Sequence, residues 1–306
     1  MKRFLLFLVA VLALSFGSCR EKAAYTVAFT VQDLSNPVWG ATAQELNRLI
    51  GQDGGEFIFM DTKNPNTQIQ QVENLISRGV DAIVIHVADP YSLENVLAQA
   101  RKAGIKIFSW DTEMENSDIN WLISNYELGT VIGTQAANWI NEKFDGIAEY
   151  ALLTYDTEAI LLERGNGIRD SMALLAPNAI RVADQSAINT LQGQSTTETI
   201  LQANPDLKVI ASIGGGGAVG ANNAVNAAGK LTPDFGIFAA DATDLEVQAM
   251  ENGEAVRMSV MISGSPNVIA KIIFDTVKDL MAGKPVERNM YRELIPITAE
   301  NTRLTR

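Results

Sequence analysis

The chain has 306 residues, of which 47% are hydrophobic and 20% are charged, and its formal net charge is −12. This length exceeds what one hydrophobic core usually fills, so two domains are expected, and the composition excludes a disordered or collagen-like chain. The acidic balance, with no run of Lys or Arg after residue 18, excludes a nucleic-acid binder, which needs a clustered basic face.

The first 18 residues have the pattern of an export signal. Lys2 and Arg3 precede an apolar stretch at residues 4–14, which is shorter than the about 20 residues of a membrane-spanning helix. We therefore expect an extracytoplasmic protein that is not integral to the membrane.

Small residues at the end of this signal lead to Cys19, the only cysteine of the chain. This pattern predicts a lipoprotein signal peptide at residues 1–18 and a lipidated Cys19 that opens a short linker at 19–24. Phe16 stands where the lipobox usually has Leu, and a plain secretory peptide with an incidental cysteine is the alternative. A single thiol forms no intramolecular disulfide.

Short apolar runs alternate with segments of helical period throughout the chain, which indicates parallel sheets built from βαβ units. We expect strands at residues 26–31, 57–60, 82–87, 106–110, 150–153, 180–183, 207–213, 235–240, 256–262 and 291–297. Helices are expected to begin after Asn36-Pro37 and after Asn64–Thr67, and another to span 267–281. The chain is therefore predicted to be an α/β protein with two Rossmann-like, doubly wound domains.

Ligands of open parallel sheets bind beyond the carboxyl ends of the strands, so the polar residues that follow each strand are candidates for a binding site. A sugar needs planar Asp, Asn or Arg groups for its hydroxyls and an aromatic platform for its ring. The predicted ligand-binding residues are Thr30, Asn36, Trp39, Trp110, Asp111, Thr112, Tyr155, Asp156, Arg164, Asn189 and Asp241.

Each of these candidates has a structural alternative. Trp39 and Trp110 also fit core packing, Asp111 and Asp241 also fit helix caps, and Arg164 also fits a solvated helix face. His86 is the only histidine and follows a strand, so a metal site is not expected, and a His-based catalytic triad would have only this candidate.

Gly215, Gly217 and Gly220 match the dinucleotide fingerprint G-x-G-x-x-G between a strand and a helix expected at residues 221–228, and Asp241 ends the next strand. A dinucleotide-dependent oxidoreductase is therefore an alternative function. Export from the cytoplasm and the lack of a nearby acid or base favour instead a plain glycine loop that lets a ligand or the opposite domain approach closely.

The chain resembles the periplasmic sugar-binding proteins of the ribose-binding type over nearly all of residues 25–300. The resemblance is carried by VAFTVQDLSNPVW at 27–39, SRGVDAIVIHVADP at 77–90, AGIKIFSWDTE at 103–113 and ASIGGGGAVGA at 211–221. It implies ligand contacts by Asn36 and Trp39 and hydrogen bonds from sugar hydroxyls to Asp111. It also implies that Arg164 and Asp241 complete the site from the second domain.

Some positions depart from the ribose pattern. Thr112 replaces the arginine that follows the aspartate, the asparagine expected near Gly214 is absent, and so is a late glutamine around residues 261–263. The run Trp110–Glu113 is more similar to the W-D-S-D element of rhamnose and furanosyl-autoinducer binders. A pentose, a hexose, a deoxysugar and a polyol all stay open.

The resemblance also implies the domain organisation, a type I periplasmic binding protein fold with a three-crossover hinge. The implied domains are residues 25–125 with 264–290, and residues 126–263 with 291–306. The implied crossovers lie near 124–126, 262–265 and 287–291.

The function implied is that of an extracytoplasmic solute-binding protein of an ABC importer, which closes on its ligand without making or breaking a bond. No enzyme activity and no cofactor are expected. The expected partners are a small sugar, the transporter permease and, through the lipid anchor alone, a membrane, and the protein is expected to be a monomer. A ligand sensor for a membrane receptor is an alternative, whereas a sugar-sensing repressor would carry a DNA-binding head where the export signal stands.

Overall fold

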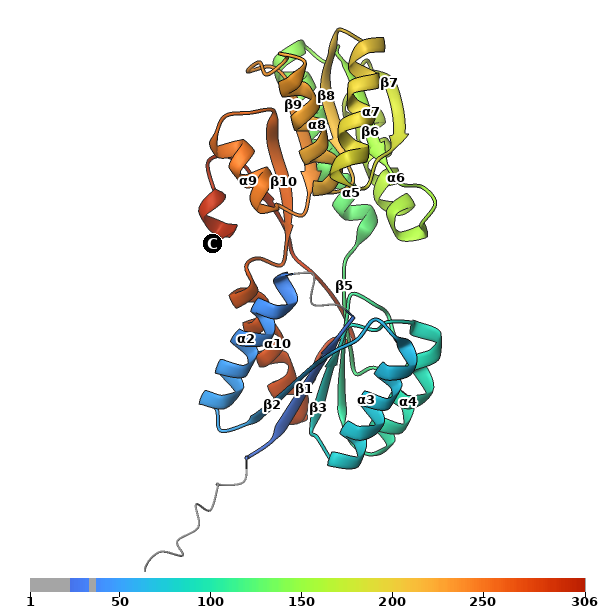
Figure 1. The fold of residues 1–306 in the computed structure, drawn as a ribbon, viewed down its shortest axis with the longest axis vertical. Coiled ribbons are helices and arrows are strands. Elements are labelled where there is room, and N and C mark those ends of the chain that lie inside the picture. The colour runs from blue at the N-terminus through green and yellow to red at the C-terminus, as the bar shows by residue number, and fades with distance from the viewer. Residues whose placement is uncertain (1–22, 33–36, 306) are drawn as a thin grey trace, which may run out of the picture.

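The computed structural model describes residues 23–32 and 37–305, in which the chain forms two lobes stacked along its long axis (Figure 1). Each lobe is built around a six-stranded sheet. Lobe I contains the sheet with the order β11-β5-β4-β3-β1-β2, and lobe II contains the sheet with the order β12-β10-β9-β8-β6-β7. All pairings are parallel except that of β12 with β10.

The strands of lobe I are β1 (Thr26–Val31), β2 (Glu56–Asp61), β3 (Ala82–Ile85), β4 (Lys106–Trp110), β5 (Ile119–Leu122) and β11 (Asn289–Tyr291). Its helices are α2 (Pro37–Gln52), α3 (Pro65–Arg78), α4 (Pro90–Lys102) and α10 (Pro266–Met281). Helices α2 and α10 pack on one face of the sheet and α3 and α4 on the other, so apolar strand residues are buried on both faces.

The strands of lobe II are β6 (Glu149–Thr154), β7 (Ile180–Ser186), β8 (Leu207–Ser212), β9 (Gly236–Ala240), β10 (Val256–Ile262) and β12 (Leu294–Ile297). Its helices are α5 (Asn125–Phe144), α6 (Ala159–Leu175), α7 (Thr190–Ala203), α8 (Gly215–Ala227) and α9 (Asp244–Glu251), and a short 3-10 helix (Thr302–Thr305) follows β12. Helices α5 and α6 cover one face, and α7, α8 and α9 cover the other.

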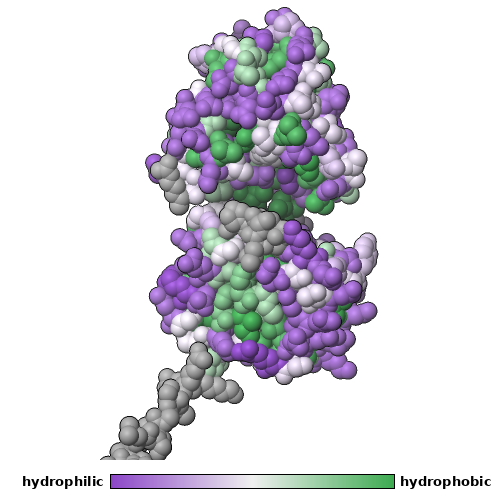
Figure 2. Space-filling view, in the orientation of Figure 1, coloured by the Kyte–Doolittle hydropathy of each residue, from purple (hydrophilic) through white to green (hydrophobic). Residues whose placement is uncertain are grey.

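The chain passes between the lobes three times, at residues 123–124, 263–265 and 292–293. The third passage lies just beyond the predicted 287–291. The single strand expected at 291–297 is in fact two short strands, because β11 pairs with β5 in lobe I while β12 pairs with β10 in lobe II. These passages narrow the molecule to a waist. On the face shown in Figure 2, hydrophilic residues predominate on both lobes, and lobe I also carries a hydrophobic patch.

Sequence patterns located most strands closely, and β1, β4 and β10 have the predicted bounds. Two further elements differ. Strand β5 was not predicted because Asn120 interrupts its short apolar run, and helix α8 begins at Gly215 rather than at 221. Within the described residues, no helix is long and apolar enough to span a bilayer.

The glycines at the start of α8 belong to a helix rather than to the predicted loop, and they bring α8 against α7. A Cβ atom on Gly220 would lie 2.2 Å from the carbonyl oxygen of Thr190, and one on Gly216 would lie 2.6 Å from that of Ile188. Any larger residue would push the two backbones apart. These glycines therefore serve the packing of lobe II.

Candidate functional site

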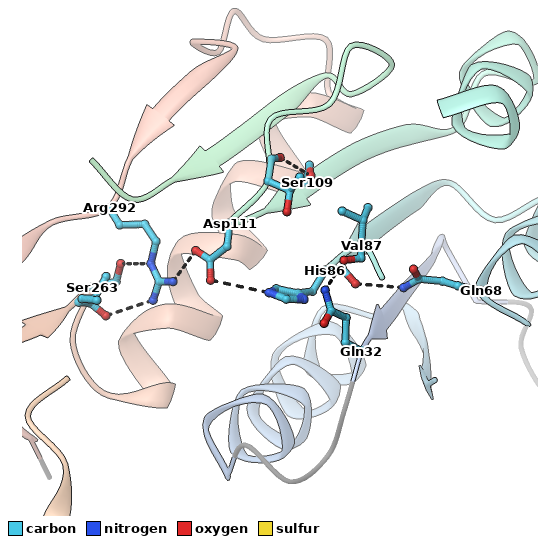
Figure 3. Close-up of polar contacts among 10 residues, drawn as sticks. Gln32, Gln68, His86, Val87, Ser109, Asp111, Ser263 and Arg292 are labelled. Atoms are coloured by element: carbon cyan, nitrogen blue, oxygen red, sulfur yellow. Dashed lines mark hydrogen bonds and ion pairs between the residues drawn. The ribbon is translucent and has the colours of Figure 1, made fainter. Parts of the chain in front are cut away.

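The edge of lobe I that faces the waist presents Asp111, His86 and Trp39 (Figure 3 shows the first two). Asp111 directly follows β4 with a left-handed backbone (φ 61°), and its amide donates to the carbonyl of Trp121 at 2.9 Å. His86 follows β3, and its Nε2 lies 3.9 Å from Oδ2 of Asp111. Trp39, in the first turn of α2, packs on the imidazole with 4.5 Å between ring centroids.

His86 is a mostly neutral group at this edge. Burial lowers its pKa below the ordinary 6.5, the Asp111 carboxylate opposes that shift, and the Arg292 guanidinium adds to it. Its Nδ1 is buried without a hydrogen-bond partner. A neutral imidazole beside a carboxylate offers one donor or acceptor position to a ligand at Nε2.

Arg292, in the third passage between the lobes, is the partner of Asp111 that the sequence did not reveal. Its Nη1 donates to Oδ1 of Asp111 at 2.7 Å (Figure 3). The two residues are 181 positions apart in the chain, and no pattern links them. A charged residue next to a predicted crossover was the only available signal.

The facing edge of lobe II presents Arg164, which is 9% exposed on α6. Its Nε and Nη2 donate to Oδ1 of Asn125 at 3.1 and 2.7 Å, and its Nη1 donates to the carbonyl of Ile213 at 2.7 Å. Burial lowers the pKa of Arg164 below its ordinary value, and the carboxylates of Asp241 and Asp111 partly oppose this shift. The guanidinium of lobe II therefore lies within electrostatic reach of carboxylates from both lobes.

Close packing of α5 on α6 sets the position of Arg164. A Cβ atom on Gly129 of α5 would lie 1.9 Å from the backbone oxygen of Arg164, and one on Gly167 of α6 would lie 2.1 Å from that of Tyr126. The missing side chains let the two helices meet backbone to backbone. The solvated-face alternative for Arg164 is therefore wrong.

Asp241 directly follows β9 in a turn whose backbone is left-handed at two successive residues, Asp241 (φ 92°) and Ala242 (φ 44°). Oδ2 of Asp241 accepts a hydrogen bond from the amide of Gly215 at 2.9 Å, the first residue of α8. Asp241 thus caps a neighbouring helix, while Thr243 caps the helix that follows it. Asp241 is otherwise exposed at the edge of lobe II.

Glu246 lies directly behind this turn and was not predicted as part of the site. It is fully buried, and its Oε2 accepts from both the amide and the hydroxyl of Thr243 at 2.8 Å, while its Oε1 has no partner. Burial, with a further contribution from the Asp241 carboxylate, raises the pKa of Glu246 to about 7. Near neutral pH this buried carboxyl beside Asp241 is therefore only partly ionised.

Two predicted residues are used inside lobe I. Trp110 is 1% exposed and stacks on Phe29 with 5.7 Å between ring centroids, so its ring is core rather than a platform open to the waist. Thr30 is fully buried, and its hydroxyl donates to Gln71 and accepts from Gln68 of α3. Periodicity alone did not distinguish these buried strand residues from site residues.

Of the other predicted residues, Asp156 is exposed and paired with Arg169 at 2.7 Å, and the Asn189 side chain caps α7 by accepting from the amide of Gln192. Thr112 and Tyr155 are partly buried just after β4 and β6. Asn36 and Cys19 lie outside the described residues.

The described residues contain no cluster of three or more His, Cys, Asp or Glu side chains with the arrangement of a metal site. The G-x-G-x-x-G match has no open cradle either, because the amide of Gly215 is bonded to Asp241 and the other two glycines pack against residues 187–194. The geometry therefore defines two wound α/β lobes whose facing edges carry polar side chains, Asp111 on lobe I and Arg164 and Asp241 on lobe II.

These features are those of a two-lobed solute-binding protein, and comparison with known proteins agrees. A family model described as periplasmic binding protein domain matches residues 27–285, and the chain belongs to this family. It is an extracytoplasmic binding protein and not an enzyme, as the sequence predicted.

Among the relatives is the ribose import binding protein of Bacillus subtilis, 24% identical over 278 residues that cover 90% of this chain and 87% of that protein. A structure titled periplasmic ribose ABC transporter from Conexibacter woesei superposes with a TM-score of 0.79 at 18% identity, over 92% of this chain and 95% of that one. A solute-binding protein from Actinobacillus succinogenes with bound D-allose gives 0.76 at 22% identity, over 91% and 99%. At these identities the solved structures establish the fold alone, and they confirm the predicted type I fold.

Proposed function

We propose that this chain is the sugar-binding component of an ABC importer and that it holds a neutral monosaccharide between Asp111 of lobe I and Asp241 of lobe II. One observation carries the proposal. The two carboxylates follow strands β4 and β9 at the facing edges of the lobes, and both interact electrostatically with the guanidinium of Arg164. Carboxylates and guanidinium groups are the side chains that pair with vicinal hydroxyls.

Backbone strain supports the same location. The described part of the chain contains five non-glycine residues with positive φ, and four of them, Asp111, Asp241, Ala242 and Ser263, follow the strands β4, β9 and β10. Such conformations cost of order 1–3 kcal/mol each and persist at binding sites where the surroundings hold them.

The charges of the site favour a neutral ligand over an ion. Two carboxylates, Asp111 and Asp241, face two guanidinium groups, Arg164 and Arg292, and the nearby imidazole is mostly neutral. A sugar would give hydroxyl hydrogens to the carboxylates and accept from the donors, while its apolar face would lie on Trp39.

The relatives agree with this ligand class. Proteins named for ribose import, D-xylose binding and fructose import match 90%, 82% and 90% of this chain at 24–26% identity. We infer a pentose or hexose for this chain, with the deoxysugars and polyols as further members of the screening panel.

Binding would proceed by closure of the two lobes about the three passages. These lobes correspond to the predicted domains, residues 25–125 with 264–290 and residues 126–263 with 291–306, except that Asn125 lies in α5 of lobe II and Tyr291 in β11 of lobe I. Closure replaces water around the sugar hydroxyls by fixed protein partners, and the permease of the importer would recognise the closed form. The protein would act as a monomer, attached to a membrane through a lipid on Cys19.

The test is a thermal-shift and calorimetric screen of the chain, refolded to remove carried ligand. The panel contains D-ribose, D-xylose, D-arabinose, D-fructose, D-allose, L-rhamnose, glycerol and a nicotinamide dinucleotide. At 100 times its dissociation constant a ligand adds about 2.7 kcal/mol and raises Tm by several degrees.

The variants Asp111→Asn and Asp241→Asn should remove most of the shift at the same sugar concentration, while calorimetry at higher sugar concentration still measures their weakened affinity. Asp279→Asn, which removes an exposed carboxylate paired with Lys284 at the far end of α10, should leave the shift unchanged. A dinucleotide shift without any sugar shift would refute the proposal.

A further inference from the structure

Arg292, in the third passage, makes polar contacts with residues at or beside the other two passages. Its amide donates to the carbonyl of Leu122 at 2.8 Å, beside the first passage. Its Nε donates to the hydroxyl of Ser263 at 2.9 Å, and its Nη2 to the carbonyl of Ile262 at 3.2 Å, at the second passage. Arg292 therefore joins all three connections between the lobes.

The guanidinium is also fixed by aromatic rings. Its central carbon lies 4.8 Å from the ring centroid of Trp121 and 5.5 Å from that of Trp110. The Arg292 side chain is only 7% exposed, so these contacts and the hydrogen bonds leave it a single orientation.

The remaining nitrogen of this fixed group, Nη1, holds one oxygen of the candidate ligand-binding carboxylate Asp111 at 2.7 Å. The other oxygen, Oδ2, is 3.9 Å from His86 Nε2, which is too far for a hydrogen bond. The Asp111 side chain is 24% exposed, so Oδ2 is the oxygen left for a ligand (Figure 3).

We propose that Arg292 is a positioning residue of the ligand site, which orients Asp111 from the hinge so that one carboxylate oxygen is fixed and the other faces the ligand. This inference rests on the proposed function. Arg292 contributes to affinity through Asp111, and the planar guanidinium is required because a lysine ammonium cannot bond Asp111, Ser263 and Ile262 from one rigid plane.

The experiment is a double-mutant cycle with wild type, Arg292→Lys, Asp111→Asn and the double variant. Affinity is measured by calorimetry for the panel sugar that gives the largest shift with wild type, and Tm is measured without ligand. Arg257→Lys is the matched control. Arg257 also lies against an indole, 5.4 Å from the ring centroid of Trp139, and donates to two carbonyls, but at the opposite end of β10.

In the wild-type background, we expect Arg292→Lys to weaken sugar binding about tenfold or more. In the Asp111→Asn background, the same substitution should weaken binding less than about threefold. Arg257→Lys should leave the affinity unchanged. Additive losses of affinity would overturn the inference, as would a coupling that appears in Tm but not in affinity, since that pattern describes a structural ion pair. If wild type binds no sugar of the panel, the proposed function fails and this inference falls with it, whereas sugar binding with additive losses refutes the inference alone.

Discussion

Replacing Glu246 by Gln should remove a pH dependence of folding stability between pH 4.5 and 8. The folded carboxyl has a pKa of about 7, against an ordinary value of 4.5, mainly because it is buried. A raised pKa means that the folded protein binds this proton more tightly than the unfolded chain does. The group's contribution to stability is therefore fully present below pH 4.5 and is lost as pH rises through 7.

The magnitude follows from the same two values. At about 1.4 kcal/mol per pH unit, the interval from 4.5 to about 7 corresponds to about 3 kcal/mol, lost in full by pH 8. The Gln side chain keeps an uncharged oxygen for the amide and hydroxyl of Thr243, so the cap of α9 is retained. The variant should therefore gain stability relative to wild type as pH rises.

The assay is urea unfolding of the ligand-free chain at pH 5, 6, 7 and 8. The difference in unfolding free energy between Glu246→Gln and wild type should grow by about 2–3 kcal/mol across this range. Glu198→Gln, at an exposed position of α7, controls for the loss of one negative charge. A difference that is constant across the four pH values would show that Glu246 is not protonated in the fold and would refute the reasoning.

Two further predictions concern the site and its support. Gly129→Ala places a Cβ 1.9 Å from the backbone oxygen of Arg164 and should destabilise the protein by roughly 3 kcal/mol in urea unfolding. Gly40→Ala, with nothing within 4 Å, should stabilise α2 by up to about 1 kcal/mol, and equal effects of the two variants would contradict the α5–α6 contact. Trp39→Ala should lower sugar affinity about tenfold with little change in Tm, because the ring is only partly buried. Trp110→Ala should instead cost about 3–5 kcal/mol of stability. A large loss of Tm for Trp39→Ala, with a loss of sugar affinity but not of stability for Trp110→Ala, would show that Trp110 contacts the ligand and Trp39 belongs to the core.

Several features of the site were predictable because they depend on local patterns. Buried parallel strands are continuous apolar runs, and Asp111 and Asp241 stand directly after two of them. Arg164 was identified as a site residue from the local motif around it. The structure places these three residues at facing edges of the two lobes.

Other features depend on contacts that no local pattern encodes. Trp110 and Trp39 are both tryptophans near a strand end or a helix start, yet they differ in burial. Trp110 is enclosed between β4 and the helices α2 and α10, whereas Trp39 lies in the first turn of α2 and is only partly buried against the same cluster. The glycines at the start of α8 predict a loop from sequence alone, and only their contacts with the backbone of α7 show why a helix needs glycine there.

The sequence by itself determined the alternation of strands and helices, and with it two wound α/β lobes and the polar residues at their facing edges, since burial and periodicity act over a few residues. Only the tertiary structure decided that Arg292 reaches Asp111 across 181 positions and that Glu246 is enclosed behind Asp241. Both contacts arise where separate segments of the chain meet, and the distance between such segments is set by the packing of whole lobes.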